Sequence, residues 1–197
     1  MKRIEALQIL ADLTDQHPVV ITCAATSREL ASVKDSDNHL YLLDSMGLVG
    51  SVATGLALDL PETTPKVVGI EGDGSLLMNP NVLPTGGYVK PDMLIVLLDN
   101  QVYGSTAGLP TYSSEVDLEK LAAAAGWETG RANDPGSLKA EWSRLLEVNG
   151  RPAFLYVPIE AGNASDVPKL LIDPVSITHR FTKWLKTNED RASRRTN

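Results

Sequence analysis

Short apolar runs alternate along the chain with segments in which apolar residues recur every three or four positions. The strand-like runs are 19–22, 66–70, 93–98, a short one near Trp127, and 154–157. The helix-like segments are 4–10, 47–58, 118–125 and the residues after Asp134 and Pro135, a pair that typically starts a helix. Because 93–98 is apolar throughout, it is typical of a strand buried on both faces of a parallel sheet. The pattern predicts an α/β protein with one three-layer α/β/α domain, a mostly parallel sheet and right-handed crossovers.

Two segments depart from this alternation. Residues 79–84 (NPNVLP) stand where a helix should follow a strand, and a proline inside a helix costs about 3 kcal/mol. We therefore expect a short or kinked element around Pro80 and Pro84. Beyond Pro158 we expect an irregular excursion and then a helix from about Pro174 to Lys186. The predicted domain spans 1–187, and a disordered basic tail follows at 188–197.

Composition and charge narrow the class of protein. The chain has 197 residues, a formal net charge of −7 and one cysteine, Cys23. A chain of this length can bury roughly 70% of its unfolded surface, so it needs neither a disulfide nor a structural metal. The lone thiol and the lack of a secretory leader at Met1 indicate a cytoplasmic protein, and no apolar run approaches the ~20 residues of a membrane span. The negative charge argues against nucleic acid as a partner, since basic residues cluster only in the tail.

Small and polar residues follow three of the predicted strands, at 24–27 (AATS), 72–75 (GDGS) and 99–106 (DNQVYGST). Ligands of open α/β sheets bind at the carboxyl ends of the strands, so these segments are the candidate site. Gly72 and Gly74 allow the backbone to approach a bulky anion closely, and Ser75 can open a helix whose free N–H groups favour phosphate. Asp73 offers a hard oxygen to Mg²⁺. Taken alone, Gly-Asp-Gly equally fits a simple strand-to-helix turn.

A second oxygen donor stands one strand further along. Asn100 follows Asp73 by 27 positions, which is enough for a helix and a strand, so both side chains should project from neighbouring strand ends. A carboxylate, an amide oxygen and a backbone carbonyl suit a Mg²⁺ ion that takes its other ligands from water and a diphosphate. The sequence therefore predicts a magnesium and diphosphate site.

The segment from Gly72-Asp73-Gly74-Ser75 to Asp99-Asn100 resembles the cofactor motif of the thiamine-diphosphate (ThDP) enzymes, and 43–48 (LDSMGL) resembles their wedge segment. The resemblance implies Asp73, Asn100 and the Val102 carbonyl as Mg²⁺ ligands. It implies Met46 as the apolar wedge and the Asp44 carbonyl as the acceptor for the aminopyrimidine. It also implies that Thr26 and Ser75 hydrogen-bond the diphosphate. The other cofactor contacts that it implies are Ser27, Gly72, Gly74 and Tyr103.

Over about 2–181 the chain is most similar to sulfopyruvate decarboxylase β subunits and to the matching half of phosphonopyruvate decarboxylases. This implies non-oxidative decarboxylation of sulfopyruvate to sulfoacetaldehyde, or of phosphonopyruvate, with Met46 and Thr106 at the catalytic positions. Two residues depart from the wider ThDP pattern: Asp99 replaces an asparagine, and Thr106 stands where simple pyruvate decarboxylases have an acid. In those enzymes the acid helps to protonate the reaction intermediate, so another group or a partner must supply the proton here.

The motifs all belong to the diphosphate-binding half of such an enzyme, so the resemblance implies a hetero-oligomer with a pyrimidine-binding α subunit, of α2β2 or larger composition. A non-catalytic subunit with the same fold, or half of a ThDP carboligase, stays open as an alternative. The substrate is a small anionic 2-oxo acid whose second head is undetermined, and Arg28 is the best candidate to bind that head. A zinc site and a serine hydrolase are disfavoured, because the three histidines are widely spread and no serine lies in Gly-x-Ser-x-Gly.

Overall fold

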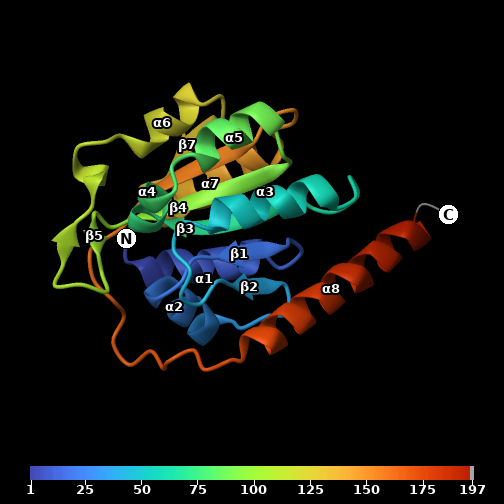
Figure 1. Cartoon of the computed structure of the whole chain (residues 1–197), viewed down its shortest axis with the longest axis horizontal. Helices are drawn as coiled ribbons and strands as arrows, with labels where there is room; N and C mark the ends of the chain where they lie inside the picture. The colour runs from blue at the N-terminus through green and yellow to red at the C-terminus, as the bar shows by residue number, and fades with distance from the viewer. Residues whose placement is uncertain (196–197) are drawn as a thin grey trace.

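The computed structural model describes residues 1–195 and shows a six-stranded parallel sheet between two helical layers (Figure 1). The strand order is β2-β1-β3-β4-β8-β7, with every neighbouring pair parallel. The strands are β1 (Val19–Ile21), β2 (His39–Tyr41), β3 (Val67–Gly72), β4 (Met93–Asp99), β7 (Glu128–Arg131) and β8 (Ala153–Pro158). The predicted α/β class and mostly parallel sheet are confirmed.

The two helical layers cover opposite faces of the sheet because side chains along each strand alternate between them. In β4, for example, Leu94 and Val96 face one core cluster while Ile95 and Leu97 face the other. The first cluster includes buried residues of α1 (Arg3–Leu13), α2 (Ala25–Val33), α7 (Pro135–Leu146) and α8 (Pro174–Arg195). The second includes buried residues of α3 (Val49–Asp59), α4 (Asp73–Met78), α5 (Val82–Val89) and α6 (Leu118–Ala124).

The segment with two prolines forms two short helices. Helix α4 ends at Met78 and α5 begins only at Val82, so Pro84 falls in the first turn of α5. A first-turn proline removes no helical hydrogen bond, because those N–H groups have no partner within the helix. The expected short or kinked element is therefore a break between two helices.

Several elements differ from the expectations. The edge strand β2 and a small hairpin of β5 (Val102–Tyr103) and β6 (Leu109–Pro110), followed by the 3-10 turn η1 (Tyr112–Ser114), were not foreseen. Helix α8 does not end near Lys186 but continues to Arg195, since no glycine or proline interrupts 175–195. Of the predicted tail at 188–197, the last two residues lie outside the described residues. Within 1–195, no helix is both long and apolar enough to cross a membrane.

Candidate functional site

The carboxyl ends of β1, β3 and β4 surround a cavity of ≈ 240 Å³. The chain leaves β1 toward one side of the sheet and β3 toward the other, so this is the point where the strand order reverses. The three predicted segments all line it, through 24–26, 72–75, Asn100 and 102–106. The topology thus brings together residues of these segments that lie up to 82 positions apart.

The two glycines at the end of β3 have different surroundings. A Cβ on Gly72 would meet no atom within 4 Å, and its φ of −107° is open to any residue, so the fold itself does not require glycine there. A Cβ on Gly74 would lie 2.5 Å from Cε1 of Tyr103. Gly72 therefore leaves space in the cavity wall that only a bound ligand would use, while Gly74 admits the Tyr103 ring.

Asp73 is buried at the start of α4 and held by the chain around it. Its Oδ2 accepts hydrogen bonds from Thr111 Oγ1 at 2.5 Å and Ser113 Oγ at 3.3 Å, and its Oδ1 lies 3.4 Å from the Asn100 backbone N–H. Burial raises the pKa of Asp73, while the Thr111 hydrogen bond opposes that shift. Sequence reasoning missed Thr111 and Ser113, because nothing local links them to Asp73.

The loop after β4 turns sharply around the cavity. Gln101 has a φ of 61°, and Asn100 Oδ1 accepts a hydrogen bond from the Val102 N–H at 3.1 Å. Asp99 points away from the cavity: its carboxylate accepts from Tyr156 Oη at 2.7 Å and from Ser113 Oγ at 2.9 Å. Asp99, the departure from the ThDP pattern, thus anchors the loop that carries Asn100.

The predicted wedge segment is tied to α4. Ser75 Oγ accepts a hydrogen bond from the Gly47 N–H at 2.8 Å, and Asn79 Nδ2 donates to the Gly47 carbonyl at 2.9 Å. Leu43 and Gly47 have φ values of 36° and 75°, so the segment makes a tight turn. This turn leaves the Met46 side chain against the cavity and 38% exposed.

Not every predicted residue lines this cavity. Ser27 is buried, and its hydroxyl donates to the Thr22 carbonyl at 2.5 Å, so it fixes the start of α2. Asp44 is exposed and lines an adjoining cavity. Thr106 lies at the cavity, but its Oγ1 donates to the Tyr103 carbonyl at 2.7 Å and so closes the β5–β6 hairpin loop.

A second carboxyl group lies in the strand that leads into the site. Glu71, in β3, is fully buried, and its Oε1 accepts the Gly72 N–H at 3.0 Å. Burial raises the pKa of Glu71 to about 7. Burial therefore disfavours the charged form of both carboxyl groups, those of Glu71 and Asp73.

The donor set fits a magnesium ion that needs a diphosphate to complete it. No group of three His, Cys, Asp or Glu side chains within the described residues could hold a metal by itself. Asp73 and Asn100 supply a carboxylate and an amide oxygen at neighbouring strand ends, beside the open wall at Gly72. Hard oxygen donors in this number suit Mg²⁺ with water and phosphate as its other ligands.

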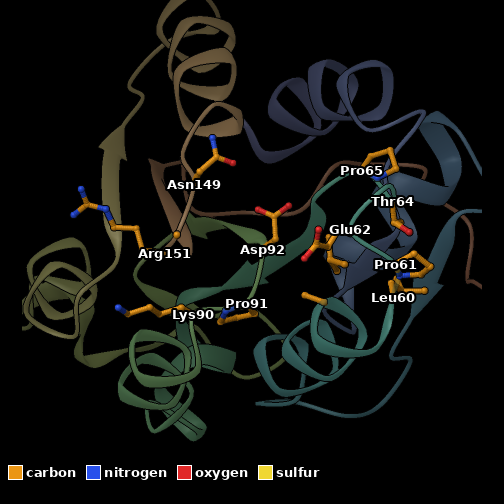
Figure 2. A pocket seen from close by; sticks show the side chains of 13 residues that line it. Leu60, Pro61, Glu62, Thr64, Pro65, Lys90, Pro91, Asp92, Asn149 and Arg151 are labelled. Carbon is orange, nitrogen blue, oxygen red and sulfur yellow. The ribbon is translucent and has the colours of Figure 1, made fainter. Parts of the chain in front are cut away.

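A larger cavity, of ≈ 370 Å³, opens at the opposite, amino-terminal ends of β3, β4 and β8 (Figure 2). Lys90 and Arg151 line one part of it and Glu62 another, with Asp92 between them. It contains none of the strand-end segments described above, so size alone does not identify the site.

Residues 21–157 match the family model for the thiamine pyrophosphate enzyme, C-terminal TPP-binding domain. The chain belongs to this family. It is 37% identical to the sulfopyruvate decarboxylase subunit beta of Methanothermobacter thermautotrophicus, over 94% of this chain and 96% of that one. It is 35% identical to the phosphonopyruvate decarboxylase of Streptomyces viridochromogenes over 94% of this chain, but it spans only 46% of that protein.

The fold agrees with this family. Benzoylformate decarboxylase from Polynucleobacter necessarius superposes with a TM-score of 0.71 at 20% identity, over 82% of this chain and 33% of the other. The chain thus corresponds in length to a separate β subunit and to about half of a single-chain phosphonopyruvate decarboxylase.

Proposed function

We propose that the chain is the diphosphate-binding β subunit of a ThDP- and Mg²⁺-dependent 2-oxo acid decarboxylase, acting on sulfopyruvate or phosphonopyruvate in the cytoplasm. The observation that carries the proposal is the meeting of Asp73 and Asn100 beside the open cavity wall at Gly72. When bound, the cofactor supplies the electron sink for loss of CO₂.

In this proposal different strand-end residues bind different parts of the cofactor. Asp73, Asn100 and the Val102 carbonyl hold Mg²⁺, and Thr26 and Ser75 hydrogen-bond the diphosphate. The Asp44 carbonyl would accept a hydrogen bond from the aminopyrimidine, and Met46 would act as the apolar wedge against the cofactor. Gly72, Gly74, Ser27 and Tyr103 shape the surrounding wall. Thr106 lies near the reacting end, and because it carries no acid, the proton must come from elsewhere.

The surroundings of the cavity support a pyrimidine-binding α subunit as partner. The chain spans under half of a single-chain relative, and large apolar side chains stand exposed beside its cavity. Met46 and Met78 line the cavity itself, and Leu109 in β6 and Tyr112 in η1 are also exposed. A pyrimidine-binding subunit seated on this end would cover them and complete the site, in an α2β2 complex or a multiple of it.

The test is turnover by the chain co-purified with its α subunit, with ThDP and Mg²⁺, against sulfopyruvate, phosphonopyruvate and pyruvate. We expect decarboxylation of one dianionic acid and its loss in Asp73→Asn, with an unchanged circular dichroism spectrum. Asp59→Asn, an exposed position at the end of α3, is the matched control and should stay active. Full turnover by Asp73→Asn at limiting Mg²⁺ would overturn the metal assignment, and no release of CO₂ from any of the three acids would overturn the activity.

A further inference from the structure

A second cavity, of ≈ 400 Å³, adjoins the cofactor cavity. The two share Ala24, Arg28 and Ser105, so a ligand in one is next to a ligand in the other. None of the residues 72–75, which would hold the diphosphate and its metal, lines the second cavity. It therefore extends the site away from the cofactor's phosphate end.

Arg28 lies between the two cavities, and the described residues offer its guanidinium no partner. It is half-buried, and among the described residues it makes no ion pair and no side-chain hydrogen bond. Arg3, the other arginine at the cofactor cavity, is instead fully engaged: its guanidinium pairs with the buried Glu29 at 2.6 Å. A partly desolvated guanidinium without a partner favours an anion, and its planar fork suits sulfonate or phosphonate oxygens.

The charges around the second cavity are net positive. Arg28 and Lys169 face one carboxylate, Asp44, and the wall also carries the hydroxyl-bearing Ser27 and Ser105. The Ser27 hydroxyl is already bonded to the Thr22 carbonyl, which leaves Ser105 as a free polar side chain. One added anionic group would balance this cavity.

A clamp of hydrogen bonds to the buried Arg3–Glu29 ion pair holds the chain at Asn163 and Ala164, ahead of Lys169. Arg3 Nη2 donates to Asn163 Oδ1 at 2.7 Å, and Glu29 Oε1 accepts the Ala164 N–H at 3.0 Å. This clamp fixes the chain after β8 against α1 and α2, and Figure 1 shows that segment running past α2 toward α8. Glu29 adjoins Arg28 in α2, so the clamp also fixes the helix from which Arg28 projects.

We propose that Arg28, supported by Lys169, binds the second anionic group of the substrate and selects dianionic 2-oxo acids over pyruvate. This rests on the proposed function, and it names the residue that sets the substrate class. Arg28 is a binding and specificity residue, while Arg3 and Glu29 act as positioning residues.

The test uses inert probes on the ThDP- and Mg²⁺-loaded complex with the α subunit. Binding is measured by calorimetry. The probes 3-sulfopropionate and 3-phosphonopropionate carry both anionic groups of the substrates without the ketone, and propionate lacks the second anionic group. We expect Arg28→Gln to weaken binding of the dianions by about 10- to 100-fold, the worth of charge-assisted hydrogen bonds, and to leave propionate and ThDP unchanged. Arg28→Lys should fall between, and the exposed Lys169→Gln should lose only about 2- to 5-fold.

Lys139→Gln, an exposed charge on α7, is the control for net charge and should change nothing. Equal affinity of the wild type for 3-sulfopropionate and propionate would overturn the proposal, as would loss of ThDP affinity in Arg28→Gln, which would place Arg28 on the cofactor. An inactive complex that still binds the dianions through Arg28 would refute decarboxylation but retain this site.

Discussion

Unusual backbone conformations at single residues gather at the candidate site. Within residues 1–195, five residues other than glycine have a positive φ, and three of them, Ala24, Leu43 and Gln101, lie in the loops around the cavities. Such conformations cost about 1–3 kcal/mol each and persist where the surroundings enforce them. They bring Thr26, Met46 and Val102 to the cavity, so the strain serves the placement of the site.

Gly72→Ala tests whether the open wall serves a ligand. The backbone tolerates alanine and a Cβ meets no atom, so the free energy of unfolding should change by less than about 0.5 kcal/mol. ThDP affinity, measured by calorimetry with Mg²⁺, should fall at least about tenfold, because the methyl group occupies the cavity wall. Gly55→Ala, an exposed position in α3 with equally open space, should retain cofactor affinity. Equal ThDP affinity in both variants would contradict this prediction.

Ala24→Gly tests the strain itself. Ala24 has φ 62° and ψ −130°, a region that glycine enters without penalty. We expect urea unfolding to show a gain of about 1 kcal/mol, after the added entropy of glycine in the unfolded chain. Ala140→Gly, in the exposed interior of α7, should lose about 1 kcal/mol. A loss in both variants would mean that Ala24 is not strained.

At the scale of elements, the turn between β2 and α3 is positioned by α4, through the contacts of Ser75 and Asn79 with Gly47. Met46→Ala should lower kcat about 10- to 100-fold with the cofactor still bound, because holding reacting groups in place contributes to lowering a barrier. Single-turnover kinetics and cofactor titration separate the two effects. Leu58→Ala, exposed on α3, is the control. Lost cofactor affinity with unchanged kcat would make Met46 an ordinary packing residue.

Strand β2 and helix α8 meet through a partly buried polar network that should respond to pH. Arg180 pairs with Asp35 at 2.6 Å, Tyr41 Oη donates to Asp35 at 3.2 Å, and His39 Nδ1 lies 3.0 Å from Tyr41 Oη. Burial lowers the pKa of His39 to about 4. The unfolded chain therefore takes up this proton first as the pH falls.

The stability that neutral His39 contributes is complete above pH ~6.5 and is lost toward pH ~4, by up to about 3 kcal/mol. His39→Gln should flatten the unfolding free energy over this range. Glu71 acts in the opposite direction, because its pKa is raised to about 7. The measurement is therefore the difference between wild type and variant in urea unfolding at several pH values. A constant difference from pH 4 to 7 would contradict the prediction.

Across the whole molecule, the feature that calls for a partner is an open cofactor cavity lined by exposed apolar side chains, Met46 at 38% and Met78 at 56% exposure. We expect the isolated chain with ThDP and Mg²⁺ to be inactive and the α subunit to restore turnover, through an interface of ~2,000 Å² or more. Light scattering and CO₂ release measure assembly and activity together. Turnover by the isolated chain at an ordinary ~1–10³ s⁻¹ would show that its own residues complete the site.

The central strands, the fold class and the three strand-end segments could be predicted from the sequence, because hydrophobic periodicity and glycine placement are local signals. The separation of Asp73 and Asn100 even predicted that they would meet. The remaining features depend on contacts between distant parts of the chain. The edge strand β2 is as short as β1 but reads His-Leu-Tyr, which is not an apolar run, so no pattern marks it. The partners of Asp73 stand 38 and 40 positions away, and the clamp joins residues up to 160 positions apart. Such contacts arise from how loops converge after the sheet has formed, and no local spacing encodes them.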